Sequence, residues 1–285
     1  VILSFLPLHH TFECTITFLY GFYSGVTVAF CDGLKYIAKN LEEYKVSVIV
    51  AVTLVLETMY KKIETGIEKQ GKTKIVNIMG KFSKFLYKYL HIDIRRKLFK
   101  SVIDQLGGKV RILYFGAAAM NKHAIDGYNM FGIASVQGYG LTETSPVVAI
   151  GNKKYHKTGS IGKCVPSDEV KLLDINKDGI GELALKGPNV MLEYYENKEA
   201  TEKVLKNGWF QTGDLARIDE EGYIFICGRK KSVIVLKNGK NIFPEEMETL
   251  INKEDGVEES FIFGKPISKD PNDIKIFVKI VYNKE

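Results

Sequence analysis

The sequence predicts an α/β protein: a partly parallel sheet flanked by helices, then a β-barrel-like subdomain, then part of a small α+β domain. In the first 150 residues short β-branched runs alternate with segments of helical spacing, which is typical of βαβ units and a mostly parallel sheet. Residues 151–228 are instead rich in Gly and Asp between short strand-like runs, which favours antiparallel strands and tight turns. The predicted domains are therefore 1–150, 151–228 and 229–285.

Local patterns place the elements of the first domain. Strand-like runs lie at residues 1–6, 26–30, 46–52 and 109–115, and helical spacing at 34–44, 54–67, 92–106 and 121–131. Asn121 is expected to cap the last helix, because an Asn side chain accepts a hydrogen bond from the first helical turn. We expect the strands that end near Phe115 and Val136 to be neighbours in the sheet.

The second half continues with shorter elements. Strands are expected at 181–186, 222–227, 232–236, 257–263 and 274–281, and a helix is expected to start at Pro244. The basic residues 229–231 interrupt the apolar pattern and predict an exposed link, with Lys231 as a hinge, because such links commonly absorb domain rotation.

Composition excludes several classes of protein. The chain has 285 residues, 45% hydrophobic and 26% charged, which suits a globular protein with a full core. Its apolar runs are shorter than the ~20 residues that cross a bilayer. Four cysteines without a C-x-x-C pair indicate reduced thiols and a cytoplasmic location, with the inner membrane surface as an alternative.

The basic charge is concentrated in residues 61–100, which hold 12 Lys/Arg and 3 Asp/Glu. The same stretch contains Phe82, Phe85, Tyr87, Tyr89 and Phe99. One interpretation is a solvated helical surface with its aromatic residues turned inward. The other is a patch for an anionic surface, either membrane lipid or nucleic acid. No nucleic-acid-binding motif is found, so we expect no nucleic-acid partner, and peripheral membrane contact is the alternative to the solvated surface.

Two motifs match only in letters. Residues 66–73 fit the G-x-x-x-x-G-K-[ST] pattern, but a charged helical segment precedes them where a phosphate-binding loop needs a buried strand. His9 and His10 with Glu13 lack a further ligand at metal-binding spacing. We therefore assign neither a phosphate-binding loop nor a metal site to these residues.

The segment Gln137-Gly-Tyr-Gly-Leu-Thr-Glu-Thr carries the clearest chemical signal. Gly138 and Gly140 allow a backbone to approach a ligand closely, and Tyr139 between them offers a ring face for stacking. Thr142 offers a hydroxyl to a phosphate, and Glu143 offers a hard carboxylate to Mg²⁺. A glycine turn with a surface threonine would give the same letters.

Further residues point to the same ligand. Gly116, Ala117 and Ala118 end a predicted strand with side chains too small to fill a crevice, and ligands bind at the carboxyl ends of parallel strands. Asp214 follows a glycine turn and is suited to two ribose hydroxyls, while Arg229 offers a charged fork to ribose or phosphate. Together they predict a nucleotide site.

Six stretches resemble, in order, motifs of the adenylate-forming (AMP-binding) superfamily of acyl-CoA synthetases, peptide-synthetase adenylation domains and luciferases. They are PLHHTF at 7–12, GYGLTET at 138–144, GELALKG at 181–187, GWFQTGD at 208–214, GRKK at 228–231 and GKNIFPEE at 239–246. Within the superfamily the chain is most similar to bacterial long-chain fatty acid–CoA ligases.

This resemblance implies two half-reactions, with ATP, Mg²⁺, a fatty acid and coenzyme A as cofactor and substrates. A carboxylate attacks the α-phosphate of ATP to give acyl-AMP and pyrophosphate, and the thiol of CoA then attacks acyl-AMP to give the thioester. An acyl-AMP ligase that delivers to a carrier protein is the first alternative. A non-catalytic surface-binding module built on residues 61–100 is the second, and a homodimer is left open.

The resemblance also implies residue roles. Thr142 is expected at the phosphates, Glu143 at Mg²⁺, and Tyr139 on the adenine, opposite Gly116–Ala118. Asp214 takes the ribose hydroxyls with help from Arg229. His10 lies near the α-phosphate and the carboxylate, with a packed core histidine as the alternative. Lys237, Gly239 and Lys240 are expected to face CoA.

Two further expectations concern the acid and the extent of the chain. The apolar segment 11–25, read as a helix, suits the wall of a fatty-acid tunnel, although aromatic residues packed in an ordinary core fit it nearly as well. The superfamily's upstream phosphate loop and late catalytic Lys are not found in the sequence. The isolated chain is therefore expected to be inactive and to expose a sheet edge.

Overall fold

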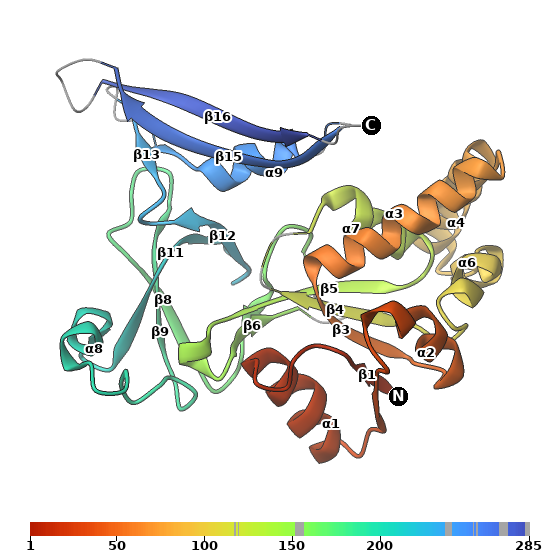
Figure 1. Cartoon of the computed structure of the whole chain (residues 1–285), viewed down its shortest axis with the longest axis horizontal. Helices are drawn as coiled ribbons and strands as arrows, with labels where there is room; N and C mark the ends of the chain where they lie inside the picture. The colour runs from red at the N-terminus through yellow and green to blue at the C-terminus, as the bar shows by residue number, and fades with distance from the viewer. Residues whose placement is uncertain are drawn as a thin grey trace. The chain divides into compact units, whose positions relative to one another are not determined.

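The computed structural model describes residues 1–116, 118, 120–151, 157–236, 241–252, 254, 256–267 and 273–282. These residues form two compact units, Val1–Val165 and Pro166–Glu285 (Figure 1). The first unit contains the α/β elements expected for residues 1–150 and extends to Val165. The second contains the predicted antiparallel strands and the small α+β segment.

A seven-stranded sheet forms the centre of the first unit, in the order β2-β1-β3-β4-β5-β6-β7. The strands are β1 (Ile2–Ser4), β2 (Val28–Phe30), β3 (Val48–Val52), β4 (Ile112–Gly116), β5 (Ala134–Gly140), β6 (Val147–Ile150) and β7 (Lys163–Cys164). The first five strands in this order are parallel, and β6 and β7 add antiparallel pairs. This confirms the predicted fold class.

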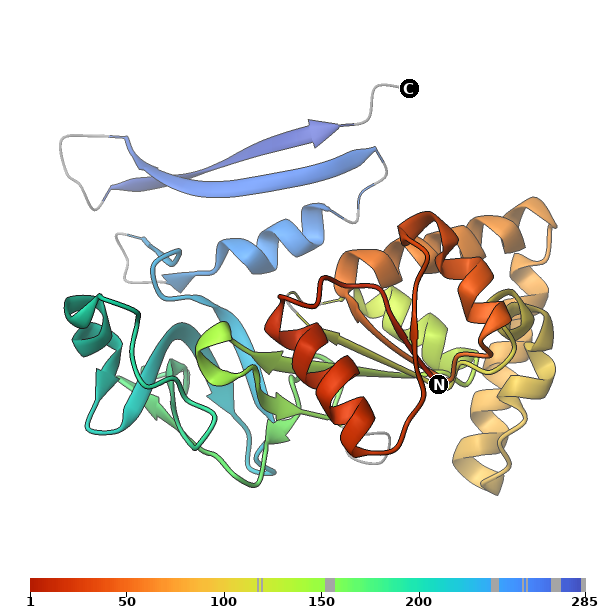
Figure 2. The ribbon, with the colours of Figure 1, turned by 60° about the horizontal axis from the view of Figure 1, so that its bottom comes forward.

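Helices cover both faces of this sheet. They are α1 (Tyr20–Tyr23) after the π-helical η1 (Glu13–Leu19), α2 (Ile37–Glu43) after η2 (Leu34–Tyr36), α3 (Thr53–Lys69), α4 (Thr73–Leu90), α5 (Arg95–Leu98), α6 (Lys100–Gln105) and α7 (Lys122–Met130). The η1–α1 segment lies on one face, and α3 and α7 lie on the other (Figures 1 and 2). Strands covered on both sides become continuously apolar, as in the Val48–Val52 sequence VIVAV.

The core of the first unit joins the sheet to these helices. Leu3, Ile49, Leu113 and Phe115 are at most 1% exposed. Tyr128 of α7 is buried among them, and its hydroxyl donates to the Leu56 carbonyl at 2.8 Å. Burial raises the pKa of this phenol well above its ordinary value, so it stays protonated.

Two expectations about residues 61–106 were wrong. The predicted helix at 92–106 is broken at Phe99, whose side chain packs on Phe131 with ring centroids 5.2 Å apart. Phe99 alone of the five aromatic residues is buried. The side chains of Phe82, Phe85, Tyr87 and Tyr89 are half or more exposed. The aromatic residues of α4 therefore do not turn inward.

The second unit begins with a curled antiparallel half-barrel, as predicted. Its strands are β8 (Glu169–Leu173), β9 (Gly181–Lys186), β10 (Leu205–Lys206), β11 (Trp209–Ile218) and β12 (Ile224–Arg229), with α8 (Lys198–Val204) between β9 and β10. The sheet order is β10-β11-β9-β8, and β12 pairs with residues 214–218 of β11. Residues 229–231 follow it and are exposed, as expected.

The α+β segment completes the second unit. It contains β13 (Ile234–Val235), β14 (Asn241–Ile242), α9 (Pro244–Ile251), β15 (Val257–Pro266) and β16 (Ile274–Tyr282). Pro244 occupies the first turn of α9, where its missing N–H costs nothing. Among the described residues, no helix has the length and apolar composition needed to cross a bilayer.

Candidate functional site

The carboxyl ends of β4 and β5 are adjacent, as the nucleotide-site hypothesis requires. The strands pair in parallel, with Phe115 opposite Gln137. A Cβ placed on Gly116 would lie 3.4 Å from the Gly138 carbonyl oxygen, so the two glycine-containing strand ends are in close contact. Ala118 follows as an exposed residue, and Ala117 lies outside the described residues.

The loop after β4 is held by the first turn of α3. The hydroxyl of Thr53 donates to the carbonyls of Ala118 at 2.7 Å and Gly116 at 3.3 Å. The Glu57 carboxylate accepts from the Asn121 N–H at 2.6 Å. Asn121 in turn caps α7 by accepting from the His123 N–H, as predicted. Thr53 and Glu57 are positioning residues that the sequence pattern did not reveal.

The loop after β5 presents Thr142 and Glu143 on a short 3₁₀ turn, Thr142–Thr144. Thr142 is exposed, Glu143 is half-buried, and Thr144 is completely buried. The Thr144 hydroxyl accepts from the Leu141 N–H at 2.9 Å and lies within hydrogen-bond distance of the Pro146 carbonyl. This buried side chain fixes the turn that carries the exposed Thr142 and the half-buried Glu143.

Gly140 is required by the same turn. A Cβ at this position would lie 1.8 Å from the Pro146 carbonyl oxygen, far inside any real contact. A Cβ on Gly138 would meet nothing closer than 3.6 Å. The first glycine of the motif is thus tolerant, and the second is dictated by the fold of the loop itself.

His10 lies at the start of the segment that leads into η1. It is exposed, so the core-histidine alternative was wrong, and its Nδ1 accepts from the Phe12 N–H at 3.2 Å. The η1 helix that follows is tied to the Thr142–Thr144 turn, because the Thr15 hydroxyl donates to the Ser145 carbonyl at 3.2 Å. Segments 130 residues apart are therefore brought together.

Glu13 supports the His10 segment from inside. Its carboxylate is buried and accepts from the hydroxyls of Ser4 at 2.6 Å and Thr17 at 2.9 Å. Burial raises the pKa of this carboxyl, against the opposing effect of its hydrogen bonds. Glu13 thereby joins the end of β1 to η1 on either side of His10, a role that sequence reasoning missed.

In the second unit, Asp214 and Arg229 face each other across β11 and β12. The Arg229 Nε lies 2.9 Å from the Asp214 Oδ1; Asp214 is nearly buried and Arg229 is mostly exposed. Behind them the Thr212 hydroxyl donates to the Leu183 carbonyl at 2.8 Å and accepts from the Asp214 N–H at 3.0 Å. The predicted ribose-binding pair is thus formed within one sheet.

Glu182 of β9 organises this corner. One carboxylate oxygen accepts from the Gly213 N–H at 3.1 Å, and the other accepts from the Lys230 Nζ at 2.6 Å. The hydrogen bond to Glu182 raises the pKa of Lys230. Lys230 also donates its backbone N–H to the Gly213 carbonyl. Lys231, the predicted hinge, is exposed immediately after this anchored residue.

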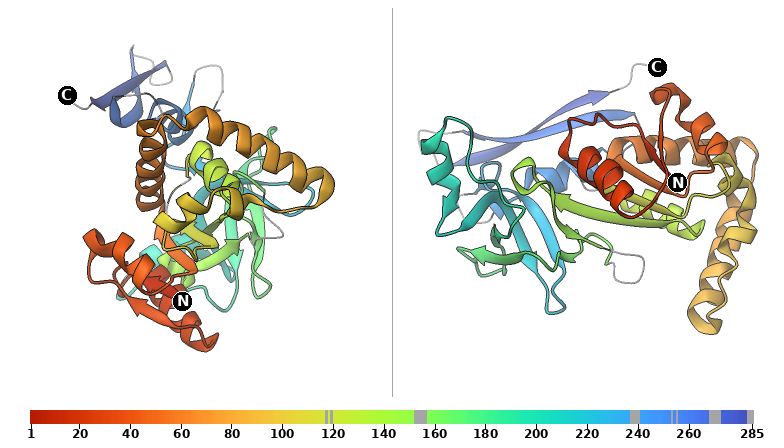
Figure 3. Two further views of the ribbon diagram at one scale, coloured as in Figure 1. Left: turned by 90° about the vertical axis from the view of Figure 1, so that its right-hand side faces the viewer. Right: turned by 90° about the horizontal axis from the view of Figure 1, so that it is seen from below.

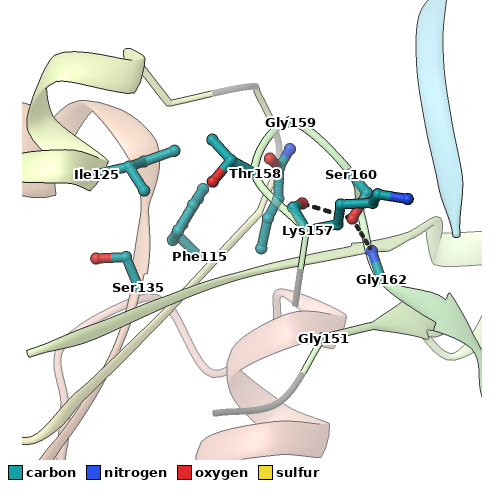
Figure 4. A pocket seen from close by; sticks show the side chains of 10 residues that line it. Phe115, Ile125, Ser135, Gly151, Lys157, Thr158, Gly159, Ser160 and Gly162 are labelled. Atoms are coloured by element: carbon teal, nitrogen blue, oxygen red, sulfur yellow. Dashed lines mark hydrogen bonds between the residues drawn. The ribbon is translucent and has the colours of Figure 1, made fainter. Parts of the chain in front are cut away.

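A small cavity lies under the carboxyl ends of β4 and β5 (Figure 4). Its walls include Phe115, Ser135 and Gln137, and a turn in which the Ser160 hydroxyl donates to the Lys157 carbonyl. Its volume is about 20 Å³, whereas pockets for small ligands hold roughly 300 Å³ or more. This cavity is therefore not a nucleotide pocket.

The donor set suits a magnesium nucleotide. Mg²⁺ is usually held by one or two carboxylates together with substrate phosphates, and Glu143 offers a single carboxylate beside the Thr142 hydroxyl. Asp214 can accept from a diol. The expected CoA-facing residues Lys237, Gly239 and Lys240 lie outside the described residues.

Comparison with known families shows which family the chain belongs to. The sequence model of the AMP-binding enzyme family matches residues 1–195, more than half of the chain. The chain belongs to the AMP-binding enzyme family. Gly116, the 137–143 segment and His10 all fall within the matched part of this AMP-binding enzyme.

The chain is also similar to individual curated proteins. A long-chain-fatty-acid–CoA ligase of Mycobacterium bovis is 32% identical over 275 residues, which cover 92% of this chain and 45% of that protein. A long-chain-fatty-acid–CoA ligase of Escherichia coli is 43% identical over 150 residues, covering 50% of this chain and 26% of that protein. The chain thus spans less than half the length of these relatives.

Solved structures share the fold. O-succinylbenzoate coenzyme A synthetase of Bacillus subtilis, in complex with ATP and magnesium ion, superposes with a TM-score of 0.75 at 22% identity, over 100% of this chain and 52% of that one. A fatty acyl CoA synthetase of Mycobacterium tuberculosis gives a TM-score of 0.62 at 25% identity, over 99% of this chain and 50% of that one. Our AMP-binding enzyme therefore has the fold of these synthetases along its whole length.

Proposed function

We propose that this chain is part of an AMP-forming acyl-CoA ligase that activates a fatty acid. ATP and the carboxylate give acyl-AMP and pyrophosphate, and the thiol of CoA then displaces AMP to form the thioester. The names of the relatives support this activity, and the ATP- and magnesium-bound structure supports the nucleotide. The activity is one for the whole protein that carries this chain.

One observation carries the proposal: the hydrogen bond from Thr15 to Ser145. It places the helix that follows His10 against the turn that presents Thr142 and Glu143. An adenylating enzyme needs its carboxylate-binding and phosphate-binding groups within one small volume, because catalysis at phosphorus depends mainly on positioning and charge stabilisation.

The proposed roles follow from side-chain chemistry. Thr142 hydrogen-bonds phosphate oxygens, and Glu143 supplies the carboxylate for Mg²⁺. Tyr139 stacks on adenine, with the small residues 116–118 on the other wall and Gln137 beside them. Asp214 accepts from the ribose hydroxyls, and Arg229 orients Asp214 through the 2.9 Å contact. His10 contacts the reacting carboxylate and α-phosphate.

The helical segment from η1 to α1 favours a long apolar acid as the substrate. Leu19, Tyr20, Phe22 and Tyr23 are all more than half exposed, so these aromatic side chains are not packed in an ordinary core. Each methylene of an acyl chain buried against such a surface contributes about 0.8 kcal/mol. We therefore expect long acyl chains to be preferred over acetate or benzoate.

The test uses the protein expressed from the complete reading frame, assayed by palmitate-dependent exchange of pyrophosphate into ATP. Glu143→Gln should lower the exchange rate by about 100-fold, because it removes a charged group that acts on the developing phosphate charge. Glu220→Gln changes an exposed carboxylate far along the chain and should leave the rate within twofold. Equal rates for the two variants would contradict the assignment of Glu143.

The acyl acceptor is tested separately. Coenzyme A or an acyl carrier protein is added to preformed acyl-AMP, and loss of free thiol is followed. Lys240→Ala should slow transfer to CoA without changing pyrophosphate exchange, if the residues 237–240 face CoA. Transfer to the carrier protein alone would establish the acyl-AMP ligase alternative.

A further inference from the structure

Helix α4 has one packed side and two exposed sides. Gly80 and Ser83 are buried, and Gly80 lies so close to Met130 of α7 that an added Cβ would come within 2.3 Å of the methionine sulfur. Val76, Met79 and Leu86 are half-buried on this side, and the other residues of the helix are exposed. Drawn in gold, α4 projects from the remainder of its unit in both views of Figure 3.

The first exposed side carries large apolar residues at intervals of three and four. We call this set the α4 apolar row: Ile75, Ile78, Phe82, Phe85 and Tyr89. Its members are 54% to 67% exposed. At 100° per residue they fall within one stripe, so the exposure is a continuous surface of the helix and not scattered single residues.

The second exposed side carries lysines. Lys74, Lys81 and Lys88 are seven residues apart, each directly before a member of the apolar row, and Lys84 lies on the same side. We call these four the α4 lysine row. Helix α4 contains no Asp or Glu, and none of the four lysines forms an ion pair within the described part of the chain. No carboxylate of α4 itself therefore balances their positive charge.

The charge decides what can cover the apolar row. Intervals of three and four also suit a coiled-coil seam, but a second copy of α4 would bring one lysine row beside another with no acidic residue between them. A nucleic acid would compensate the lysines and leave Phe82, Phe85 and the two isoleucines without an apolar environment. An anionic bilayer surface satisfies both rows, because acyl chains and acidic headgroups occur there within one side-chain length.

We propose that α4 lies in the plane of an anionic lipid bilayer. The α4 apolar row enters the boundary between headgroups and acyl chains, and the α4 lysine row contacts lipid phosphates. The helix lies on the membrane and does not cross it, because its 18 residues include five charged or strongly polar positions on one side. This inference stands independently of the reaction that the protein catalyses.

The experiment measures vesicle co-sedimentation of the 1–285 chain. Vesicles of phosphatidylcholine alone are compared with vesicles that contain about 30% phosphatidylglycerol. The wild-type chain should bind the anionic vesicles at least ~30-fold more tightly than the neutral ones, and high salt should weaken this binding. Equal binding to both, or binding to neither, would overturn the proposal.

Two triple variants separate the rows. Lys81→Gln/Lys84→Gln/Lys88→Gln should lower the partition coefficient for anionic vesicles by roughly 100-fold, because each lysine near the surface contributes a factor of several. Ile78→Ser/Phe82→Ser/Phe85→Ser should lower it by at least ~30-fold through lost apolar burial. All six positions are exposed, so circular dichroism and thermal unfolding should match the wild type.

Control variants carry changes of the same kind in the second unit. Lys177→Gln/Lys198→Gln/Lys206→Gln alters the net charge identically at exposed positions, and Leu192→Ser/Tyr195→Ser removes two apolar side chains that are about 90% exposed. Both should bind vesicles within twofold of the wild type. If these controls lose binding as strongly as the α4 variants, overall charge or stickiness explains it and the proposal fails.

Other occupants give distinct results. Light scattering without lipid would show a dimer that the apolar-row variant abolishes, if a second copy covers this face. Tighter binding to a DNA or RNA oligomer than to anionic vesicles would indicate nucleic acid. Either result overturns the proposal. In a Trp209→Phe background, Phe82→Trp should show blue-shifted emission only with anionic vesicles, and an unchanged spectrum would also overturn it.

Discussion

The loops at the ends of β4 and β5 and the corner between β11 and β12 both carry residues that are candidates for binding a nucleotide. Different interactions hold these two regions in place. The first are fixed by buried hydroxyls of Thr53 and Thr144 that bond to backbone groups. The second is fixed by the charges of Glu182 and Lys230. Neutral hydrogen bonds respond little to salt or pH, whereas ion pairs respond to both. The two regions should therefore fail under different conditions.

The largest effect is expected for Gly140→Ala. The new methyl group would overlap the Pro146 carbonyl, and the turn would have to rearrange at a cost of about 3 kcal/mol in unfolding free energy. Gly138→Ala, where the nearest atoms are 3.6 Å away, should change it by no more than about 1 kcal/mol. Urea unfolding measures both. Equal losses would show that the turn is not sterically determined.

A neutral hydrogen bond is removed by Thr144→Val. The free energy of unfolding should fall by about 1–2 kcal/mol, and this decrease should be the same at low and high salt. Thr142→Val, at the neighbouring exposed position, should stay within about 0.5 kcal/mol. A salt-dependent loss for Thr144→Val would break the contrast between the two regions.

Lys230→Met tests the charged corner. At pH 7 the free energy of unfolding should fall by about 1 kcal/mol. The decrease is small because the lysine side chain is half-exposed and solvent screens its charge. Because Glu182 raises the pKa of Lys230 above its ordinary 10.5, the stabilisation is fully present below pH 10.5. It disappears as pH rises through the higher pKa of the folded state.

The matched control is Lys231→Met. Lys231 is exposed and forms no ion pair with any residue that the structure describes. Unfolding free energies measured from pH 9 to 11.5 should converge for wild type and Lys230→Met, while Lys231→Met follows the wild type throughout. A constant difference for Lys230→Met would mean that packing, not charge, explains its contribution.

The smallest effect is expected for Arg229→Gln. Its partner Asp214 is nearly buried, but the Arg229 side chain is 57% exposed, and exposed ion pairs contribute about 0.5 kcal/mol. Added salt at about 1 M should abolish most of that difference in a denaturant titration. A loss well above 1 kcal/mol that persists in salt would place Arg229 among the structural residues of the corner.

Much of the fold could be predicted because the relevant signals are local. The apolar run at 46–52 became β3, the segment at 54–67 became α3, and Asn121 caps α7. The break at Phe99 was missed because helical spacing continues through it, whereas in the structure the Phe99 ring packs on Phe131. Packing partners 32 residues away leave no trace in a short window.

The candidate site shows the same limit. The candidate ligand-binding residues, such as Thr142, Glu143 and Asp214, stand in recognisable motifs. The residues that support the site loops, such as Thr53 and Glu182, bond to atoms 65 and 48 residues away. Their partners follow from the sheet order, so their roles became visible only with the structure.

The position of β1 has a consequence for the order of events during synthesis. This strand pairs with both β2 and β3, which follow it in the chain. Ile2 lies opposite Val48, 46 residues later, so at 5–20 residues per second the partner is made about 2 to 9 s after β1. During that interval the backbone groups of β1 that pair with β3 have no partner strand. The nascent chain must therefore avoid pairing β1 with another strand.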